Sequence, residues 1–288
     1  MTRGADLPGL LKRLYRFRRA ANSDSRLSHL LRRQRKAALV AALRRDWPGA
    51  YARTDKGELV FVPAPLEARG EHLLFYGFDM PQPVLAFAPA GGIAIDIGTN
   101  LGEWAIPLAK ALGAGGRVIC CEPNPTVAAA LAATLQINNL SHAEIFQVAL
   151  SDADGEGHLS VNPQDSGQSR LADSGIAVPL RSLDSLVAEI ALDRVDLVKI
   201  DVEGHEAAVL VGAIRTLTDF RPALIFESGH EADDGRERIA ELLEQAGYDI
   251  VAVLHHYGAL PVAMADYRAG TGPCAGDALN LLALPVKL

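Results

Sequence analysis

The run Asp96-Ile97-Gly98-Thr99-Asn100-Leu101-Gly102 is the most informative stretch of this chain. It continues the apolar residues 93–95 and precedes a helical stretch, so it predicts a buried strand, a tight turn and a helix. Gly98 and Gly102 allow the backbone to turn sharply and to approach a ligand closely. In an open α/β sheet, such a turn lies at the carboxyl edge of the strands, where ligands bind.

Strand-like and helical stretches alternate from residue 93 onward. We predict seven strands, at residues 93–97, 117–121, 144–149, 197–200, 223–226, 249–254 and 278–284. We predict helices at residues 103–112, 125–138, 183–191, 205–220 and 231–246. This alternation indicates an α/β protein with a mostly parallel seven-stranded sheet and helices on both faces. Because no helix is predicted between the last two strands, we expect them to pair antiparallel at the end of the sheet.

A carboxylate follows the second predicted strand, in the run Glu122-Pro123-Asn124-Pro125, which begins 24 residues after Gly98. A carboxylate at this place can accept hydrogen bonds from both hydroxyls of a ribose, so we expect a ligand that contains a nucleoside. Dinucleotides favour the pattern G-x-G-x-x-G with a helix N-terminus facing a pyrophosphate, but Asn100 occupies the position of the middle glycine. Asp96 would repel a pyrophosphate and suits the positive amino-acid and sulfonium end of S-adenosylmethionine. We therefore expect S-adenosylmethionine rather than a dinucleotide.

The third predicted strand leads into Leu150-Ser151-Asp152, where an adenine ring would lie beside apolar side chains. Ser151 or Asp152 could accept a hydrogen bond from the exocyclic amine of the adenine. The alternative is a simple turn, because Ser-Asp-Ala-Asp-Gly is a favourable turn sequence. The residues expected to bind the donor are therefore Asp96, Gly98, Asn100, Gly102, Glu122, Asn124, Ser151, Asp152 and Asp201.

The densest group of ionisable residues follows the fourth predicted strand, in Lys199-Ile200-Asp201-Val202-Glu203-Gly204-His205-Glu206. Asp201 and Glu203 alternate in an extended segment, so both side chains should point the same way, toward the donated methyl group. Asp201 could orient the donor or the acceptor, and Glu203 or His205 could remove a proton from an attacking hydroxyl. The alternatives are a solvent-exposed His205 and a helix-start role for Glu206.

Glu227 and His230 end the fifth predicted strand and should lie beside this group across the sheet edge. Together with Asp201 and Glu203 they are ligand types that hard cations prefer, and a bound Mg²⁺ could polarise a hydroxyl. No ligand spacing among them is diagnostic, so we expect no metal and keep Mg²⁺ as the alternative. The expected catalytic residues are Asp201, Glu203, His205 and Glu227.

The N-terminal part of the chain has a different composition. Residues 1–45 hold 13 Lys or Arg and two acids, a charge of +11, whereas the remainder carries −18, and the two add to the net −7. Leucines at helical spacing and a hairpin pattern over 50–62 predict a basic helical extension with a short β-hairpin over residues 1–75. We assign residues 76–288 to a donor-binding domain. The extension is a solvated helical face or docks an acidic partner or a membrane surface, and the acidic body disfavours nucleic acid.

Composition favours a soluble, cytoplasmic protein. Hydrophobic residues make up 49% of the chain, but no apolar run approaches the roughly 18 residues that a membrane span needs. The N-terminus lacks the features of a signal peptide. The three cysteines suit buried positions in a reducing compartment. Homo-oligomerisation is left open.

These motifs together resemble those of the FkbM-type methyltransferase family. The matching pieces run in order through residues 96–102, 122–125, 148–152, 183–184, 199–206, 227 and 280–283. The resemblance implies a class I, Rossmann-like methyltransferase fold and O-methylation of a hydroxyl on a sugar, polyketide or related natural product. It also implies that Gly98, Gly102 and Glu122 bind the donor, and it maps the Asp-Val-Glu-Gly run onto Asp201 and Glu203. Two alternatives are methylation of an amine nitrogen and a non-catalytic scaffold that binds S-adenosylmethionine.

Overall fold

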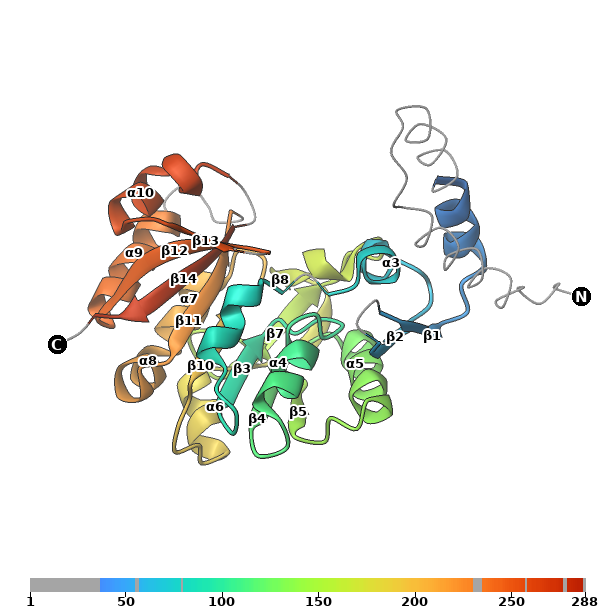
Figure 1. Cartoon of the computed structure of the whole chain (residues 1–288), viewed down its shortest axis with the longest axis horizontal. Helices are drawn as coiled ribbons and strands as arrows, with labels where there is room; N and C mark the ends of the chain where they lie inside the picture. The colour runs from blue at the N-terminus through green and yellow to red at the C-terminus, as the bar shows by residue number, and fades with distance from the viewer. Residues whose placement is uncertain are drawn as a thin grey trace, which may run out of the picture.

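The fold centres on a large sheet with helices packed on both of its faces (Figure 1). The computed structural model describes residues 37–54, 57–78, 80–229, 235–256, 258–276 and 279–286. Eight strands form the sheet: β3 (Ile93–Ile97), β4 (Arg117–Cys121), β5 (Ala143–Phe146), β10 (Leu197–Ile200), β11 (Ala223–Ser228), β12 (Tyr248–His255), β13 (Gly258–Pro261) and β14 (Leu279–Pro285). Their order across the sheet is β13-β12-β14-β11-β10-β3-β4-β5.

The prediction of a mostly parallel sheet is right for six strands, which run in one direction, but the sheet has eight strands rather than seven. β11, β10, β3, β4 and β5 pair in parallel, whereas the pairs that involve β12, β13 and β14 are antiparallel. β12 and β14 do pair antiparallel as expected, but β14 lies inside the sheet, between β11 and β12. The unpredicted strand β13 and helix α10 (Met264–Ala269) lie between them in the chain. β13 is mostly exposed and α10 has six residues, so neither produces a clear periodic pattern.

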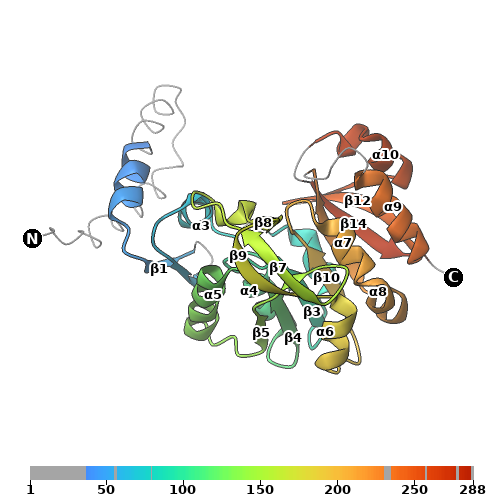
Figure 2. The ribbon, with the colours of Figure 1, turned by 180° about the vertical axis from the view of Figure 1, so that it is seen from behind.

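Two buried cores lie on opposite faces of the sheet, which confirms the prediction of helices on both faces. One face is covered by α3 (Ala68–Tyr76), α4 (Ala105–Leu112) and α5 (Pro125–Ile137). The other is covered by α6 (Leu183–Glu189), α7 (Glu206–Val211), α8 (Ile214–Phe220) and α9 (Gly235–Gln245) (Figure 2). β3 contributes to both cores, because alternate strand residues point to opposite faces: Ile95 belongs to one core and Ala94 to the other.

The predicted helix over residues 205–220 is divided into α7 and α8 around Gly212. A Cβ added to Gly212 would lie 2.1 Å from the carbonyl oxygen of Ser151, so a larger residue does not fit there. The Gly212 carbonyl oxygen accepts a hydrogen bond from the backbone N–H of Asp184 at 2.9 Å. The end of α7 is therefore packed directly on the segment that follows the third predicted strand.

The predicted hairpin is present and packs on the main body. β1 (Ala50–Arg53) and β2 (Leu59–Val62) pair antiparallel. The backbone N–H of Phe61 donates to Thr134 Oγ1 at 2.9 Å, and Asn138 Nδ2 donates to the carbonyl oxygen of Leu59 at 2.6 Å, so β2 is bonded to α5. Residues 37–46 are helical, whereas the basic segment 1–36 lies outside the described residues, and its helices and docking role stay predictions.

A second, four-stranded sheet between β5 and α6 was not predicted. It contains β6 (Ala149–Leu150), β7 (Gly155–Ser160), β8 (Arg170–Ala172) and β9 (Ile176–Arg181), in the order β6-β9-β7-β8. A short 3₁₀ helix, η3 (Ser166–Gln168), connects β7 to β8. These strands are largely exposed and rich in polar residues, which hides the period of two that marks a half-buried strand. Among the described residues, no helix is both long and apolar enough to cross a lipid bilayer.

Candidate active site

The turn after β3 is held directly against the end of β10. Gly98 has a φ of 79°, and a Cβ added to it would lie 1.8 Å from the carbonyl oxygen of Asp201. The backbone N–H groups of Gly98 and Thr99 both donate to the carbonyl oxygen of Cys121, at 3.0 and 3.2 Å. Three strand ends therefore meet at one edge of the sheet, where the sequence predicted them.

Gly102, which is expected to bind the donor, packs between two helices. Its φ of 93° favours glycine, and an added Cβ would lie 2.8 Å from side-chain carbons of both Ile106 and Leu131. These residues belong to α4 and α5. The missing side chain therefore allows the turn to pack between these two helices, and Gly102 does not line the cleft described below.

Glu122 connects two loops through its carboxylate. Oε2 accepts from the backbone N–H of Asn100 at 2.9 Å, and Oε1 accepts from that of Asn124 at 2.8 Å. Asn100 lies in the left-handed region, with a φ of 49°, which turns its N–H toward the carboxylate. Burial raises the pKa of Glu122 to about 7, although the two hydrogen bonds favour its charged form. Each carboxylate oxygen has a second lone pair, which leaves acceptors for a ligand.

A cleft that contains about 620 Å³ of space, including open solvent, lies over this edge of the sheet. We call it the donor cleft, after the methyl donor that the sequence predicts. Glu122, Gly98 and Asn100 line it on one side. Its apolar lining residues are Ile97, Cys121, Pro123, Val148, Ala149, Leu150, Leu159, Leu171 and Val202. Nine polar or charged residues also line it, and an apolar wall combined with polar groups suits a small ligand.

Ser151 and Asp152 are not among the residues that line the donor cleft. Ser151 Oγ donates to Asp152 Oδ1 at 3.0 Å and is hydrogen-bonded to His205 Nε2 at 2.9 Å. His205 does line the donor cleft, and burial lowers its pKa, which favours the neutral ring at pH 7. The contact of Ser151 or Asp152 with an adenine stays a prediction, and the hydrogen bonds that the structure shows for Ser151 and Asp152 lead to His205.

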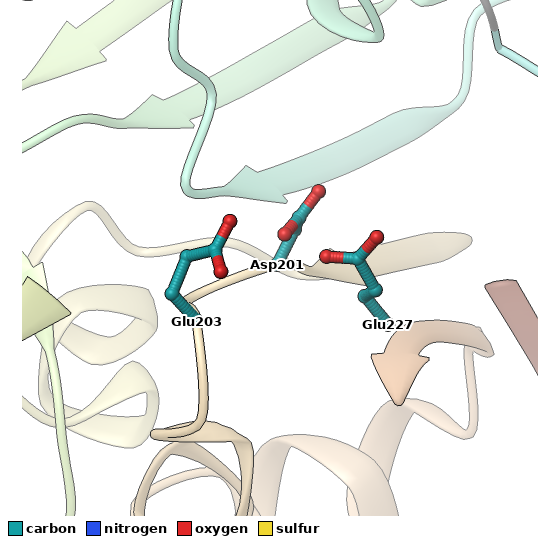
Figure 3. A group of neighbouring side chains, drawn as sticks. All are labelled: Asp201, Glu203 and Glu227. Atoms are coloured by element: carbon teal, nitrogen blue, oxygen red, sulfur yellow. The ribbon is translucent and has the colours of Figure 1, made fainter. Parts of the chain in front are cut away.

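Asp201, Glu203 and Glu227 form a carboxylate cluster, in which one oxygen of each lies within 4.8 Å of the others (Figure 3). Lys199, which is 1% exposed, contacts Asp201 Oδ2 at 3.1 Å. Burial and the Asp201 charge raise the pKa of Glu227 to about 9. Burial alone would raise the pKa of Asp201 as well, but Lys199 and a hydrogen bond with Glu227 hold it below its usual value. At neutral pH, Glu227 is therefore protonated and donates to the Asp201 carboxylate.

Asp96 contributes an acceptor to a small cavity beside the cluster. It is 2% exposed, and its Oδ2 has no hydrogen-bond partner among the described residues. Burial raises its pKa to about 7, with Lys199 acting in the opposite direction. Asp201 and Glu227 line the same cavity. Because buried polar atoms are nearly always hydrogen-bonded, Oδ2 can accept a hydrogen bond from an N–H or O–H group of a ligand in this cavity.

The carboxylate cluster has ligand types suited to a hard cation, as anticipated. However, the Lys199 ammonium and the proton shared by Asp201 and Glu227 already balance much of its charge. His230, the fourth ligand type considered from the sequence, lies outside the described residues. Function without a metal therefore stays a prediction.

A second, open and polar cleft adjoins the donor cleft. It contains about 1500 Å³ of space, including open solvent, and we call it the polar cleft. Glu203 has a φ of 54° and lines both clefts, and Glu227 lines the polar one. Its remaining lining residues are Ala68, Arg69, His72, Ser160, Asn162, Asp165, Gly167, Gln168 and Arg170.

Sequence reasoning missed two segments of this site. α3 contributes Arg69, which lines the donor cleft, the polar cleft and the Asp96 cavity. Residues 159–171 of the small sheet contribute the opposite wall of both clefts. Both segments precede or interrupt the alternation of strands and helices, and no motif marks either of them.

The order of the strands, with an antiparallel β14 inserted next to the five parallel strands, defines a class I methyltransferase fold. The chain belongs to the FkbM methyltransferase family, because the family model described as "Methyltransferase FkbM domain" matches residues 96–250. This match contains the Gly98 turn, Glu122 and the carboxylate cluster.

Similar proteins carry related names. The chain is 28% identical over 186 residues to the 2-O-methyltransferase NoeI of Sinorhizobium fredii, covering 58% of this chain and 72% of NoeI. It is 26% identical over 201 residues to methyltransferase sdnD of Sordaria araneosa, covering 58% of this chain and 77% of that protein. A crystal structure of methyltransferase FkbM from Methylobacillus flagellatus matches with a TM-score of 0.47 and 16% identity, over 98% of this chain and 60% of that one.

Proposed function

We propose that this protein transfers a methyl group from S-adenosylmethionine to a hydroxyl oxygen of a small-molecule, glycan or natural-product acceptor. The observation that carries the proposal is the position of Glu203, a carboxylate that lines both the donor cleft and the polar cleft. The proposed donor lies in the first cleft and the proposed acceptor in the second. A group that must take a proton during transfer would have to lie where the two meet.

The residues of the donor cleft fit S-adenosylmethionine. The apolar wall suits an adenine, and Glu122 retains lone pairs for the hydroxyls of a ribose. The unpartnered Asp96 Oδ2 suits the ammonium of the amino-acid end. The carboxylate cluster gives the neighbouring space a negative charge, which suits a sulfonium. A dinucleotide would bring a pyrophosphate into the same acidic surroundings, which would be unfavourable.

The chemistry divides simply between the donor and the protein. S-adenosylmethionine supplies a methyl group already activated by the sulfonium, so the new O–C bond forms as the S–C bond breaks. The protein contributes mainly by positioning the hydroxyl in line with that bond. Glu203 takes the hydroxyl proton, and protonated Glu227 donates to Asp201, which keeps that carboxylate oriented. His205 is a weaker candidate for the base, because its side chain is hydrogen-bonded to Ser151. In addition, His205 lines the donor cleft but not the polar cleft, where the acceptor would bind.

Transfer to oxygen is supported by one relative in particular. NoeI is named a 2-O-methyltransferase, and the alignment with it covers 58% of this chain. An amine acceptor would lose its proton more easily and would depend less on a carboxylate at position 203. The dependence on Glu203 therefore separates the two acceptor types.

The proposal is tested first by isothermal titration of the full chain with S-adenosylhomocysteine. We expect binding by the unaltered protein, and absence of binding would contradict the proposal. The second test follows transfer of labelled methyl groups to sugars, glycosides and hydroxylated natural products. For an accepted hydroxyl substrate, Glu203→Gln should lower kcat by roughly 10²- to 10⁴-fold and leave S-adenosylhomocysteine binding nearly unchanged.

Glu241→Gln is the matched control for this test, because Glu241 is an exposed glutamate on α9 that lines neither cleft. Its kcat should equal that of the unaltered protein. If Glu203→Gln retained most of its activity, Glu203 would not be the base, and an amine acceptor would be favoured.

A further inference from the structure

We propose that Arg69 of α3 binds the carboxylate at the amino-acid end of the methyl donor. The inference rests on the proposed function, because it assumes that S-adenosylmethionine occupies the donor cleft. It goes beyond that function by assigning a binding residue to a helix that precedes residues 96–250, the part of the chain matched by the family model. A segment outside the part matched by the family model would then complete the donor site.

Arg69 lies where the amino-acid end of the donor would be. Its side chain is 25% exposed and lines the donor cleft as well as the adjoining cavity that contains Asp96. If the ammonium of the donor binds Asp96, the carboxylate on the same carbon atom must lie in the same cavity. Arg69 Nη1 contacts Glu103 Oε2 at 3.0 Å, which holds the guanidinium at the wall of this cavity.

The charges of the cavity leave few places for a carboxylate. The carboxylates of Asp96 and Asp201 line it and would repel a second anion, whereas Glu227, which also lines it, is protonated at neutral pH. The cations among its lining residues are Arg69 and Lys199. Lys199 is 1% exposed and contacts Asp201 at 3.1 Å, whereas the Arg69 side chain is 25% exposed and can be reached by a ligand while it contacts Glu103. The guanidinium of Arg69 has five N–H donors in a planar arrangement that can bind a carboxylate through two of them while Glu103 is also bound.

The neighbouring loop holds Arg69 in this position before any ligand binds. A Cβ added to Gly167 would lie 3.0 Å from Arg69 Nε and 3.1 Å from Nη2, so the η3 backbone packs closely on the guanidinium. The backbone N–H of Ala68 donates to the carbonyl oxygen of Gln164 at 2.8 Å. Glu67 accepts from the backbone N–H of Ser166. An arginine held in this way loses little conformational freedom when it binds an anion.

The experiment compares two ligands that differ in the amino-acid end. S-adenosylhomocysteine has the carboxylate, whereas 5′-methylthioadenosine has the same nucleoside without it. We expect Arg69→Ala to weaken binding of S-adenosylhomocysteine by about 10- to 100-fold in isothermal titration and to leave binding of 5′-methylthioadenosine unchanged. Arg69→Lys keeps the charge without the planar pair of donors and should weaken S-adenosylhomocysteine binding by a smaller factor.

The control is Arg44→Ala. Arg44 contacts Glu71 of α3, the helix that contains Arg69, at 2.9 Å. It is 50% exposed and lines neither cleft, so the Arg44→Ala variant should bind both ligands normally. The proposal is overturned if Arg69→Ala binds S-adenosylhomocysteine normally or loses both ligands equally. If Arg69→Ala does not fold, as judged by its melting curve, Arg69→Lys carries the same comparison. If the unaltered protein fails to bind S-adenosylhomocysteine, the proposed function itself fails, which is a different result.

Discussion

Among single residues, the acids of the site differ in how strongly they hold a proton. Burial and the Asp201 charge raise the pKa of Glu227 to about 9, far above its usual value of 4.5. A raised pKa stabilises the folded state fully below pH 4.5, and this stabilisation is lost as the pH rises through about 9. Between these values, the free energy of unfolding should fall by up to about 1.4 kcal/mol per pH unit because of this residue alone.

Glu227→Gln should therefore change the pH dependence of stability. Glutamine can donate to Asp201 as the protonated acid does, but it does not titrate. We expect the variant to gain stability relative to the unaltered protein as the pH rises from 5.5 to 8.5, measured by urea unfolding at each pH. Parallel pH profiles of the two proteins would show that Glu227 titrates normally.

Donor binding should release protons at neutral pH. Burial raises the pKa of both Asp96 and Glu122 to about 7, so each is about half protonated there. An ammonium beside Asp96 and ribose hydroxyls that donate to Glu122 would both favour the charged carboxylates. We expect release of between about half a proton and one proton per S-adenosylhomocysteine bound at pH 7.

The observed binding enthalpy should then depend on the ionisation enthalpy of the buffer, and Glu122→Gln should reduce that dependence. Proton uptake would contradict the assignment.

Among the elements, the closest approach is between the ends of β3 and β10. Because a Cβ on Gly98 would lie 1.8 Å from the Asp201 carbonyl oxygen and φ is positive, Gly98→Ala must separate these two strand ends. We expect a loss of about 2 kcal/mol or more in the free energy of unfolding and loss of S-adenosylhomocysteine binding. Gly115→Ala is the control, because its Cβ would come no nearer than 3.9 Å to Gly91. Equal stability of the two variants would contradict this account.

The elements also explain which parts of the fold could be predicted. β3 is buried along its whole length and α5 begins with Asn124 as N-cap and Pro125, so both have clear sequence signals. β7 and β9 are exposed and pair mainly with each other, so their sequences lack a core-facing pattern. The same difference explains the site. Glu122 and Asp201 follow patterned strands, whereas Arg69 reaches the site through a tertiary contact that no local pattern contains.

At the scale of the whole molecule, three regions of the chain enclose the site. The sheet edge provides the acids, the small sheet provides the opposite wall, and α3 closes the side. The donor cleft has an apolar wall of nine residues beside its polar groups, whereas the adjoining polar cleft is lined mainly by charged and amide side chains. In the proposed function, the apolar wall of the donor cleft would therefore bind the nucleoside. The polar cleft would bind a hydrophilic acceptor, and Glu203 would lie beside both.

The hydrogen bond from Ala68 to Gln164 joins segments that are almost a hundred positions apart. A chimera that received only residues 96–250 from a relative would combine a foreign loop with the native α3. The residues around 67–69 and 164–167 should consequently be exchanged as a pair when acceptor or donor preference is transplanted between members of the family.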